Sequence, residues 1–207
     1  MTEPATDHRR AIAERNDEAI ADAALRLLER RHALSMAAIA AEAGVSRQTL
    51  YAHHKTIGDV LAGVVDRAVA HALEGFEAAE AEHGDPAAAL ERMVAASWGR
   101  LTGLGALRQA SEEHLPAERV HHAHAPLMER VRALVERGQA SGAFRADLDP
   151  GWLVTVYFAL VHAADDHARA SGGDRDPTLA ELTSSVRAVF DAGGSGRRSP
   201  GRSDFTA

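Results

Sequence analysis

The chain has 207 residues, of which 45% are apolar, 26% charged and only 4% aromatic, a balance typical of a globular protein with an aliphatic core. Its formal net charge of −7 argues against indiscriminate nucleic-acid binding, and the absence of cysteine excludes disulfide bonds, thiolate zinc sites and a cysteine nucleophile. No apolar run is long enough to span a bilayer and the N-terminal residues lack the apolar stretch of a secretory signal, so we expect a cytoplasmic protein.

Helical periodicity runs through the sequence, and no segment alternates apolar and polar residues as a half-buried strand would. The first predicted helix covers about residues 15–31, because Ile20, Ala24 and Leu27 recur on one face. The later predicted helices end at turn residues and cover about 36–43, 47–53, 56–82, 87–101, 116–141, 150–170 and 178–191, with a short helical piece after a bend at 102–105. The chain is therefore predicted to be all-α, with about nine helices.

The two short helices near the N-terminus match a helix-turn-helix. Ser35 and Ser46 stand where each helix needs an N-cap, and Gly44 stands where the backbone must turn through the left-handed conformation. Ala40 is small enough for the helices to cross closely, and Val45 is the apolar plug between them. The pattern predicts a second helix held at a fixed angle to the first.

The second short helix is too polar for a core helix, because only Leu50 points inward. Arg reads guanine and Gln reads adenine in the major groove, Thr touches the thymine methyl, and Tyr, His or Lys hold phosphates. The candidate DNA-binding residues are Ser35, Ser46, Arg47, Gln48, Thr49, Tyr51, His53 and Lys55. Individually, Gln48 and Thr49 also fit a solvated helix face, and Ser46 caps its helix with or without DNA.

The run IAAEAGVSRQTLYAH, from Ile39 to His53, resembles the DNA-binding domain of TetR-like (tetracycline-repressor type) transcriptional regulators. Residues 23–28 resemble the first helix of that family, and residues 138–147 resemble its hinge into the penultimate long helices. The resemblance implies a homodimer with two DNA-reading domains and a larger helical body around a small-molecule pocket. It implies a repressor that leaves double-stranded operator DNA when an effector binds.

On this basis we expect four segments along the chain. They are a flexible N-terminal arm at 1–14, a helix-turn-helix DNA-binding domain at 15–62, a helical ligand-binding and dimerisation domain at 63–192, and a disordered tail at 193–207 that is rich in Gly, Ser and Arg. All of the net negative charge lies after residue 55, because residues 1–55 hold equal numbers of acidic and basic side chains.

Three positions depart from the family pattern. Ala37 stands where the family commonly has a basic residue, Ile57 where it usually has Lys, and His54 where it commonly has Phe. Two phosphate contacts are therefore missing, and Lys55 is close enough to replace one. Because each phosphate contact adds affinity through counterion release, we expect weak or salt-sensitive DNA binding.

Bulky residues of the C-terminal body fit either a plain core or the wall of an apolar cavity. The candidate ligand-binding residues are Trp98, Leu101, Met128, Phe158 and His162. His162 follows Phe158 by one helical turn and is the polar group expected to point into the cavity. Dimerisation through the last two long helices would bury their apolar faces, with the candidates Val154, Phe158, Val161, Val186, Val189 and Phe190.

Histidine clusters leave a metal-responsive regulator open as an alternative. The two groups are His121, His122 and His124, and His162, Asp165, Asp166 and His167. The spacing of His162 and Asp166 places both on one helix face, as two metal ligands require. Amphipathic surfaces explain the same residues, so we expect no metal site and no cofactor.

A second alternative is a protein-interaction module that keeps the helix-turn-helix shape but has weakened DNA binding. The missing cations at Ala37 and Ile57 favour it. Enzyme classes find little support, because the sequence contains no phosphate-binding Gly-Lys loop, no His-Glu-x-x-His pair and no Gly-x-Ser-x-Gly elbow.

Overall fold

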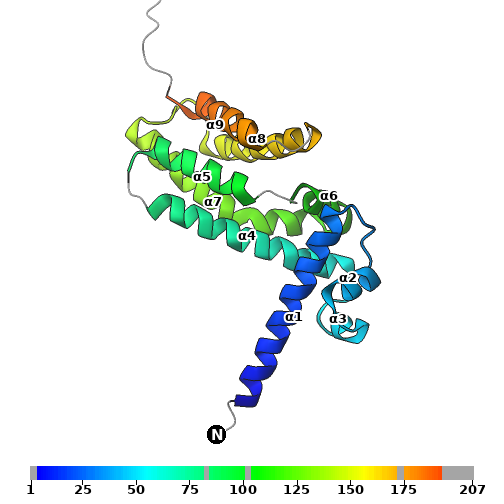
Figure 1. Cartoon of the computed structure of the whole chain (residues 1–207). Coiled ribbons are helices and arrows are strands. Elements are labelled where there is room, and N and C mark those ends of the chain that lie inside the picture. Colours follow the sequence, from blue (N-terminus) through cyan, green and yellow to red (C-terminus); the bar gives the residue numbers. More distant parts are fainter. Residues whose placement is uncertain (1–3, 82–83, 101–103, 172–174, 193–207) are drawn as a thin grey trace, which may run out of the picture.

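The structure is a computed structural model that describes residues 4–81, 84–100, 104–171 and 175–192 (Figure 1). Within these ranges it contains nine helices, which confirms the predicted all-α fold. They are α1 (Pro4–Glu29), α2 (Met36–Ala43), α3 (Arg47–His53), α4 (Ile57–Ala81), α5 (Pro86–Arg100), α6 (Leu104–His114), α7 (Ala117–Ser141), α8 (Pro150–Ala170) and α9 (Arg175–Phe190). No helix in these ranges is long and apolar enough to cross a membrane.

The ends of α2 and α3 follow from local sequence. The Ser35 hydroxyl accepts a hydrogen bond from the N–H of Ala38 at 3.1 Å, and the Ser46 hydroxyl accepts one from the N–H of Thr49 at 3.0 Å. Each bond satisfies a donor that has no partner inside the first turn of a helix. Gly44 ends α2 with φ of 67°, a conformation that a residue with a side chain adopts only under strain.

The start of α1 differs from the prediction. The helix begins at Pro4, so residues 4–14, expected to be a flexible arm, are helical and extend away from the rest of the molecule (Figure 1). Helical periodicity of apolar residues begins only near Ile20, which is why the pattern missed this part. Pro at the first helical position and the Ala, Glu and Arg that follow favour a helix through propensity instead. The predicted tail at 193–207 lies outside the described residues.

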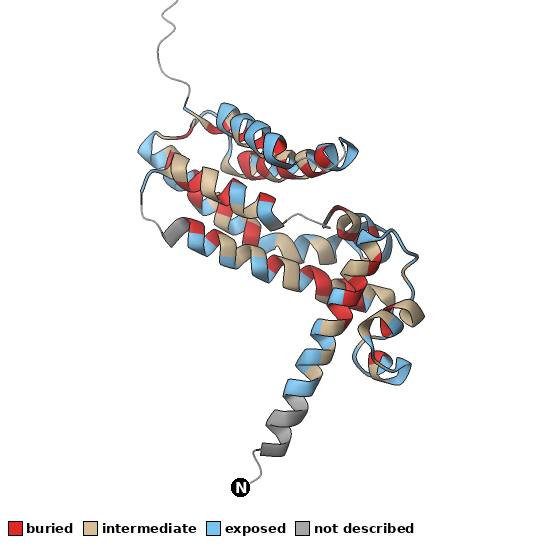
Figure 2. Cartoon of the chain, in the orientation of Figure 1, coloured by how far each residue is buried: buried red, intermediate tan, exposed pale blue. Residues whose placement is uncertain are grey.

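The helices form two parts joined by α4. The first part, here called the head, consists of α1, α2, α3 and the first turns of α4. The second part, here called the body, consists of the rest of α4 and α5–α9 (Figure 1). Figure 2 shows that burial in α1 is concentrated where the helix crosses α2 and α4. Ile20, Ile39 and Leu50 are fully buried in the head, and each contributes about 1.5–3 kcal/mol to stability.

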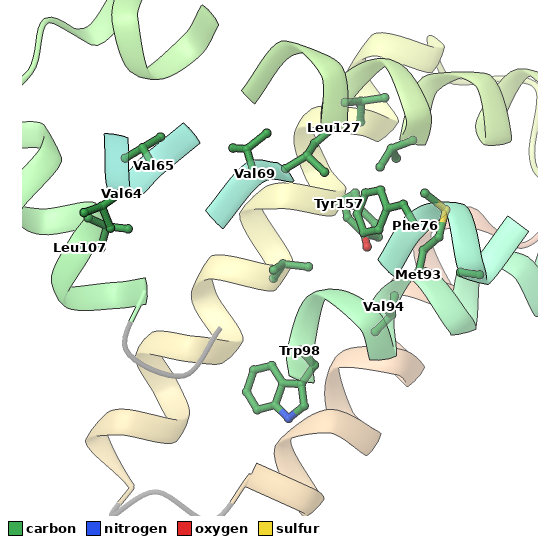
Figure 3. Packing of buried hydrophobic residues seen from close by; sticks show 14 of the residues in the cluster. Val64, Val65, Val69, Phe76, Met93, Val94, Trp98, Leu107, Leu127 and Tyr157 are labelled. Carbon is green, nitrogen blue, oxygen red and sulfur yellow. The ribbon is translucent and has the colours of Figure 1, made fainter. Parts of the chain in front are cut away.

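The core of the body is built around Tyr157, Phe76 and Met93, which come from three helices (Figure 3). The Tyr157 hydroxyl lies 2.9 Å from the hydroxyl of Ser97, so this buried polar group has a partner. Burial raises the pKa of Tyr157 far above its usual range, although the bond to Ser97 lowers it slightly. The ring of Tyr157 is therefore neutral and serves as packing.

Candidate DNA-binding surface and ligand cavity

The outward face of α3 carries the polar side chains expected to read DNA. Arg47 and Gln48 are exposed, and 46% of Tyr51 is exposed although it is a large, mostly apolar residue. Leu50 faces the opposite way and is fully buried. Figure 1 shows α3 at the edge of the molecule, remote from α8 and α9. The helix therefore presents Arg, Gln and Tyr to whatever approaches the head.

Other candidates in this segment are engaged in local structure. Thr49 is half-buried and its hydroxyl lies 2.8 Å from that of Ser46, so both hydroxyls support the start of α3. The ammonium of Lys55 is exposed and donates a hydrogen bond to the Tyr51 carbonyl at 2.9 Å, at the C-terminal end of α3. An ammonium has three donors, so a phosphate can share it.

His53 points toward α1 rather than straight outward. Its Nδ1 lies 3.0 Å from Oδ1 of Asp17, and 24% of its side chain is exposed. The Nε2 atom of His54 lies 3.4 Å from the same oxygen, is buried, and forms no hydrogen bond with any described residue. Sequence reasoning missed this cluster because Asp17 lies far from the histidines in the chain. His54, at the position where the family commonly has Phe, thus lies beside the carboxylate of Asp17.

Residues of six helices line a cavity of about 1050 Å³. Its apolar wall comes largely from α4, α6 and α7, through residues such as Val65, Val69, Leu107 and Leu127. Helices α1, α5 and α8 complete the wall. A space of this size and lining holds a drug-sized molecule.

Three of the five expected ligand-binding residues, Met128, Phe158 and His162, line this cavity. Trp98 is not among the residues that line it. Its side chain extends from α5 and is buried in the protein core. Figure 3 shows the indole apart from Leu127 and Val69 of the cavity wall. Leu101 lies outside the described residues. The spacing of apolar residues identified buried faces, but it could not say which of them border empty space.

Alternating charges form the polar end of the cavity. Arg108 of α6 lies 3.0 Å from Glu112 and 3.0 Å from Asp166 of α8. Arg169 also pairs with Asp166, and its Nε lies 3.2 Å from Asp165, whose side chain is almost fully buried. The network therefore connects α6 to α8 at the cavity wall.

His162 lies beside this network. Burial lowers the pKa of His162 most, and the positive charges of Arg108 and His124 lower it further, while Asp166 and Asp165 oppose the shift. The uncharged form of the His162 ring is therefore favoured.

Four of the six residues expected at a dimer interface lie inside the subunit instead. Val154, Val161, Val186 and Phe190 are each no more than 3% exposed, because α8 and α9 pack their apolar faces against the rest of the body. Phe158 and Val189 are half-buried. Periodicity marks an apolar face but does not say whether the same subunit or another copy covers it. The large apolar residue left exposed on α8 is Trp152, at 56%.

Within the described residues, no three His, Cys, Asp or Glu side chains converge as metal ligands. Asp166 is engaged by Arg108 and Arg169, and the Nδ1 atom of His124 lies 2.8 Å from the carbonyl of Val120. The two histidine groups noted in the sequence therefore do not form a ligand set in this part of the chain.

Two family models match the chain. Residues 20–64 match "Bacterial regulatory proteins, tetR family", and residues 86–189 match "Tetracyclin repressor-like, C-terminal domain". No curated protein matches the chain significantly.

Solved structures with the same fold include the fatty acid degradation regulator FadR from Bacillus halodurans. It is 18% identical, with a TM-score of 0.75 over 88% of this chain and 97% of that one. FadR from Bacillus subtilis in complex with stearoyl-CoA is 19% identical, with a TM-score of 0.72 over 82% of this chain and 94% of that one. LfrR from Mycobacterium smegmatis in complex with proflavine is 23% identical, with a TM-score of 0.69 over 84% of this chain and 96% of that one.

These likenesses agree with the geometry of the head and the body. One family match covers the helix-turn-helix, and the other covers most of the body that encloses the cavity. The chain belongs to the TetR family of bacterial transcriptional regulators.

Proposed function

We propose that this regulator is a repressor that binds double-stranded operator DNA as a homodimer and leaves it when a small molecule occupies the cavity. The observation that carries the proposal is the position of α4. This single helix begins next to the end of α3 and lines the cavity further along, through residues 64–76. A ligand that moves α4 therefore moves the helix that reads DNA.

The start of α4 is rigidly attached to the head. The Asp59 carboxylate accepts hydrogen bonds from the N–H groups of Lys55 and Thr56, each at 2.9 Å, and the Thr56 hydroxyl accepts one from the N–H of Asp59. These bonds, first of all those to Thr56, lower the pKa of Asp59. The reciprocal cap keeps the turn between α3 and α4 in one conformation.

Helix α6 supplies a second connection between cavity and head. Gly58 faces the carbonyl of His114 so closely that a Cβ atom on Gly58 would lie 3.0 Å from this oxygen. Ser111 and Glu112, one turn earlier on α6, line the cavity. Because effector and DNA each bias the position of the same helices, each must weaken the binding of the other by the same factor.

A dimer places two copies of α3 in successive major grooves, roughly 34–36 Å apart, on a pseudo-palindromic site. The outer faces of α8 and α9 offer the surface for pairing, with exposed Trp152 and the small exposed residues Ala180, Ser184 and Ala188. The complexes of two structural neighbours with stearoyl-CoA and proflavine support a small molecule as the effector class.

The test is to select binding sequences from a random pool of double-stranded DNA and to measure affinity by fluorescence anisotropy. We expect a pseudo-palindromic sequence, and Arg47→Ala and Tyr51→Ala should each weaken binding by about 1–3 kcal/mol. Arg132→Ala, which removes a half-buried arginine from α7 in the body, is the matched control and should not change the affinity for DNA. Failure to enrich any sequence would overturn the proposal and favour the protein-interaction module.

A further inference from the structure

One hydroxyl in the cavity wall has no partner. Ser111 of α6 is 2% exposed, lines the cavity, and its Oγ atom forms no hydrogen bond within the described residues. Thr155 of α8, which also lines the cavity, behaves differently, since its hydroxyl donates a bond to the Gly151 carbonyl at 3.0 Å. A buried hydroxyl without a partner costs stability, so Ser111 needs a partner that enters the cavity.

The fixed charges of the wall, by contrast, are engaged with one another. Arg67 donates hydrogen bonds to Asp22 at 3.1 Å and to the Glu18 carbonyl at 3.0 Å. The remaining charged residues of the wall, Glu112, Arg108, Asp166 and Asp165, form an alternating network with Arg169, which lies outside the wall. Each guanidinium in this network is paired with a carboxylate and each carboxylate with a guanidinium, so neither an anion nor a cation finds an unpaired partner there. Its buried carboxylate, Asp165, is held by Arg169 and is not offered to a cation.

The other polar side chains that face the cavity are histidines and the hydroxyl of Ser97, which is paired with that of Tyr157. A carbonyl only accepts hydrogen bonds, so the contact with Val120 places a proton on Nδ1 of His124 and directs this nitrogen away from a ligand. Burial lowers the pKa of His162, which favours its uncharged ring. His71 and His121 complete the set and are exposed to solvent.

We propose that the cavity binds an uncharged amphiphile, an apolar molecule with a hydroxyl or carbonyl group that forms a hydrogen bond with Ser111. The inference rests on the proposed effector function and narrows its ligand class. It separates this chain from regulators that bind an anionic acyl thioester or a cationic dye. The apolar wall holds the hydrocarbon part, Ser111 selects a group that forms a hydrogen bond, and the paired charges of the wall offer no partner to an ion.

Isothermal titration calorimetry on the full chain without DNA tests this inference. The probes are 1-octanol, octanoate and octyltrimethylammonium, which share the alkyl chain and differ in charge. We expect 1-octanol to bind at least about tenfold more tightly than either ion, the difference that one desolvated charge without a partner readily produces. Ser111→Ala should weaken 1-octanol binding about five- to tenfold, the effect of one hydrogen bond.

Thr155→Val is the matched control, because it removes a hydroxyl of the same wall that is already bonded within its own helix. It should leave the affinity unchanged. The melting temperature of unliganded Ser111→Ala should not fall, since Ala favours the helix and the lost hydroxyl had no partner. That measurement separates a weaker ligand contact from a damaged fold.

Tighter binding of either ion, no binding of 1-octanol, or unchanged affinity in Ser111→Ala would each overturn the inference. The last result would mean that the hydroxyl serves a water molecule only. Anisotropy with operator DNA keeps the two proposals distinguishable. If only octanoate releases the DNA, the proposed effector function is supported and the uncharged ligand class is rejected. If 1-octanol binds but does not release the DNA, the uncharged ligand class is supported and the coupling between cavity and DNA binding is rejected.

Discussion

The carboxylate of Asp17 on α1 lies 3.0 Å from Nδ1 of His53, the last residue of α3. The same oxygen lies 3.4 Å from Nε2 of His54. An acidic side chain thus stands beside the surface on which we expect DNA phosphates to lie. Its contacts orient α3 relative to α1, while its charge repels the DNA backbone.

We therefore expect Asp17→Asn to raise operator affinity about two- to fivefold at low salt, because an amide still accepts a hydrogen bond but carries no charge. The gain should shrink in high salt, where charge interactions are screened. Anisotropy titrations at two salt concentrations measure it. Asp22→Asn, which removes a similarly exposed carboxylate that pairs with Arg67, is the control and should give a smaller gain. Equal gains in both variants would contradict a specific role for Asp17.

The missing cation at Ala37 gives a second prediction. Ala37→Arg restores a basic residue early in α2 and should increase operator affinity. If the new side chain reaches a phosphate, the slope of log K against log salt should steepen by about 0.9. Salt titrations of the wild type and the variant on one duplex measure this slope. An unchanged slope would mean that this part of α2 does not approach the DNA backbone.

The revised dimer surface predicts different outcomes for buried and exposed positions. Trp152→Glu places a charge on the exposed face of α8 and should give folded monomers with lost operator binding. Val186→Asp, in contrast, buries a charge in the core of the subunit and should lower its stability by several kcal/mol. Light scattering and thermal melts distinguish the two results. A Trp152→Glu variant that stays dimeric would place the interface elsewhere.

Gly138 in α7 gives a prediction about packing. A Cβ atom there would overlap the ring of Phe144. This ring is buried and packs edge-on against that of Phe190, with 5.7 Å between the ring centroids. Because the ring has no room to move, Gly138→Ala should destabilise the fold by about 1–3 kcal/mol in urea unfolding. Gly99→Ala is the control, since Gly99 is exposed in α5 with no atom near the added methyl, and it should stabilise slightly.

The pKa of His162 predicts a dependence of stability on pH. Burial first, and then Arg108 and His124, lower this pKa, against the opposing effect of Asp166 and Asp165. The unfolded chain therefore binds a proton at this residue more readily than the folded one, so stability present above the unfolded pKa of about 6.5 is lost as pH falls. Urea unfolding at pH 7.5 and 5.5 should show a smaller loss in His162→Gln than in the wild type.

Short-range features of this chain follow from the order of its residues. Ser35, Ser46 and Gly44 act on backbone groups within a few residues of themselves, and Leu50 is buried because its helix has one apolar side. Such interactions depend little on the rest of the molecule, so the helix-turn-helix was predictable to within a residue or two.

Features that join distant parts of the chain were not predictable in this way. The contact between Asp17 and His53 and the network across α6 and α8 require two helices to meet at one angle and register. Apolar residues such as Phe190 and Val186 suit a dimer interface as well as the core of one subunit. Only the packing of the helices places these two inside the subunit and leaves Trp152 exposed. The cavity is the clearest case, because the unpaired Ser111 hydroxyl comes to face a cavity only when six helices pack around that space.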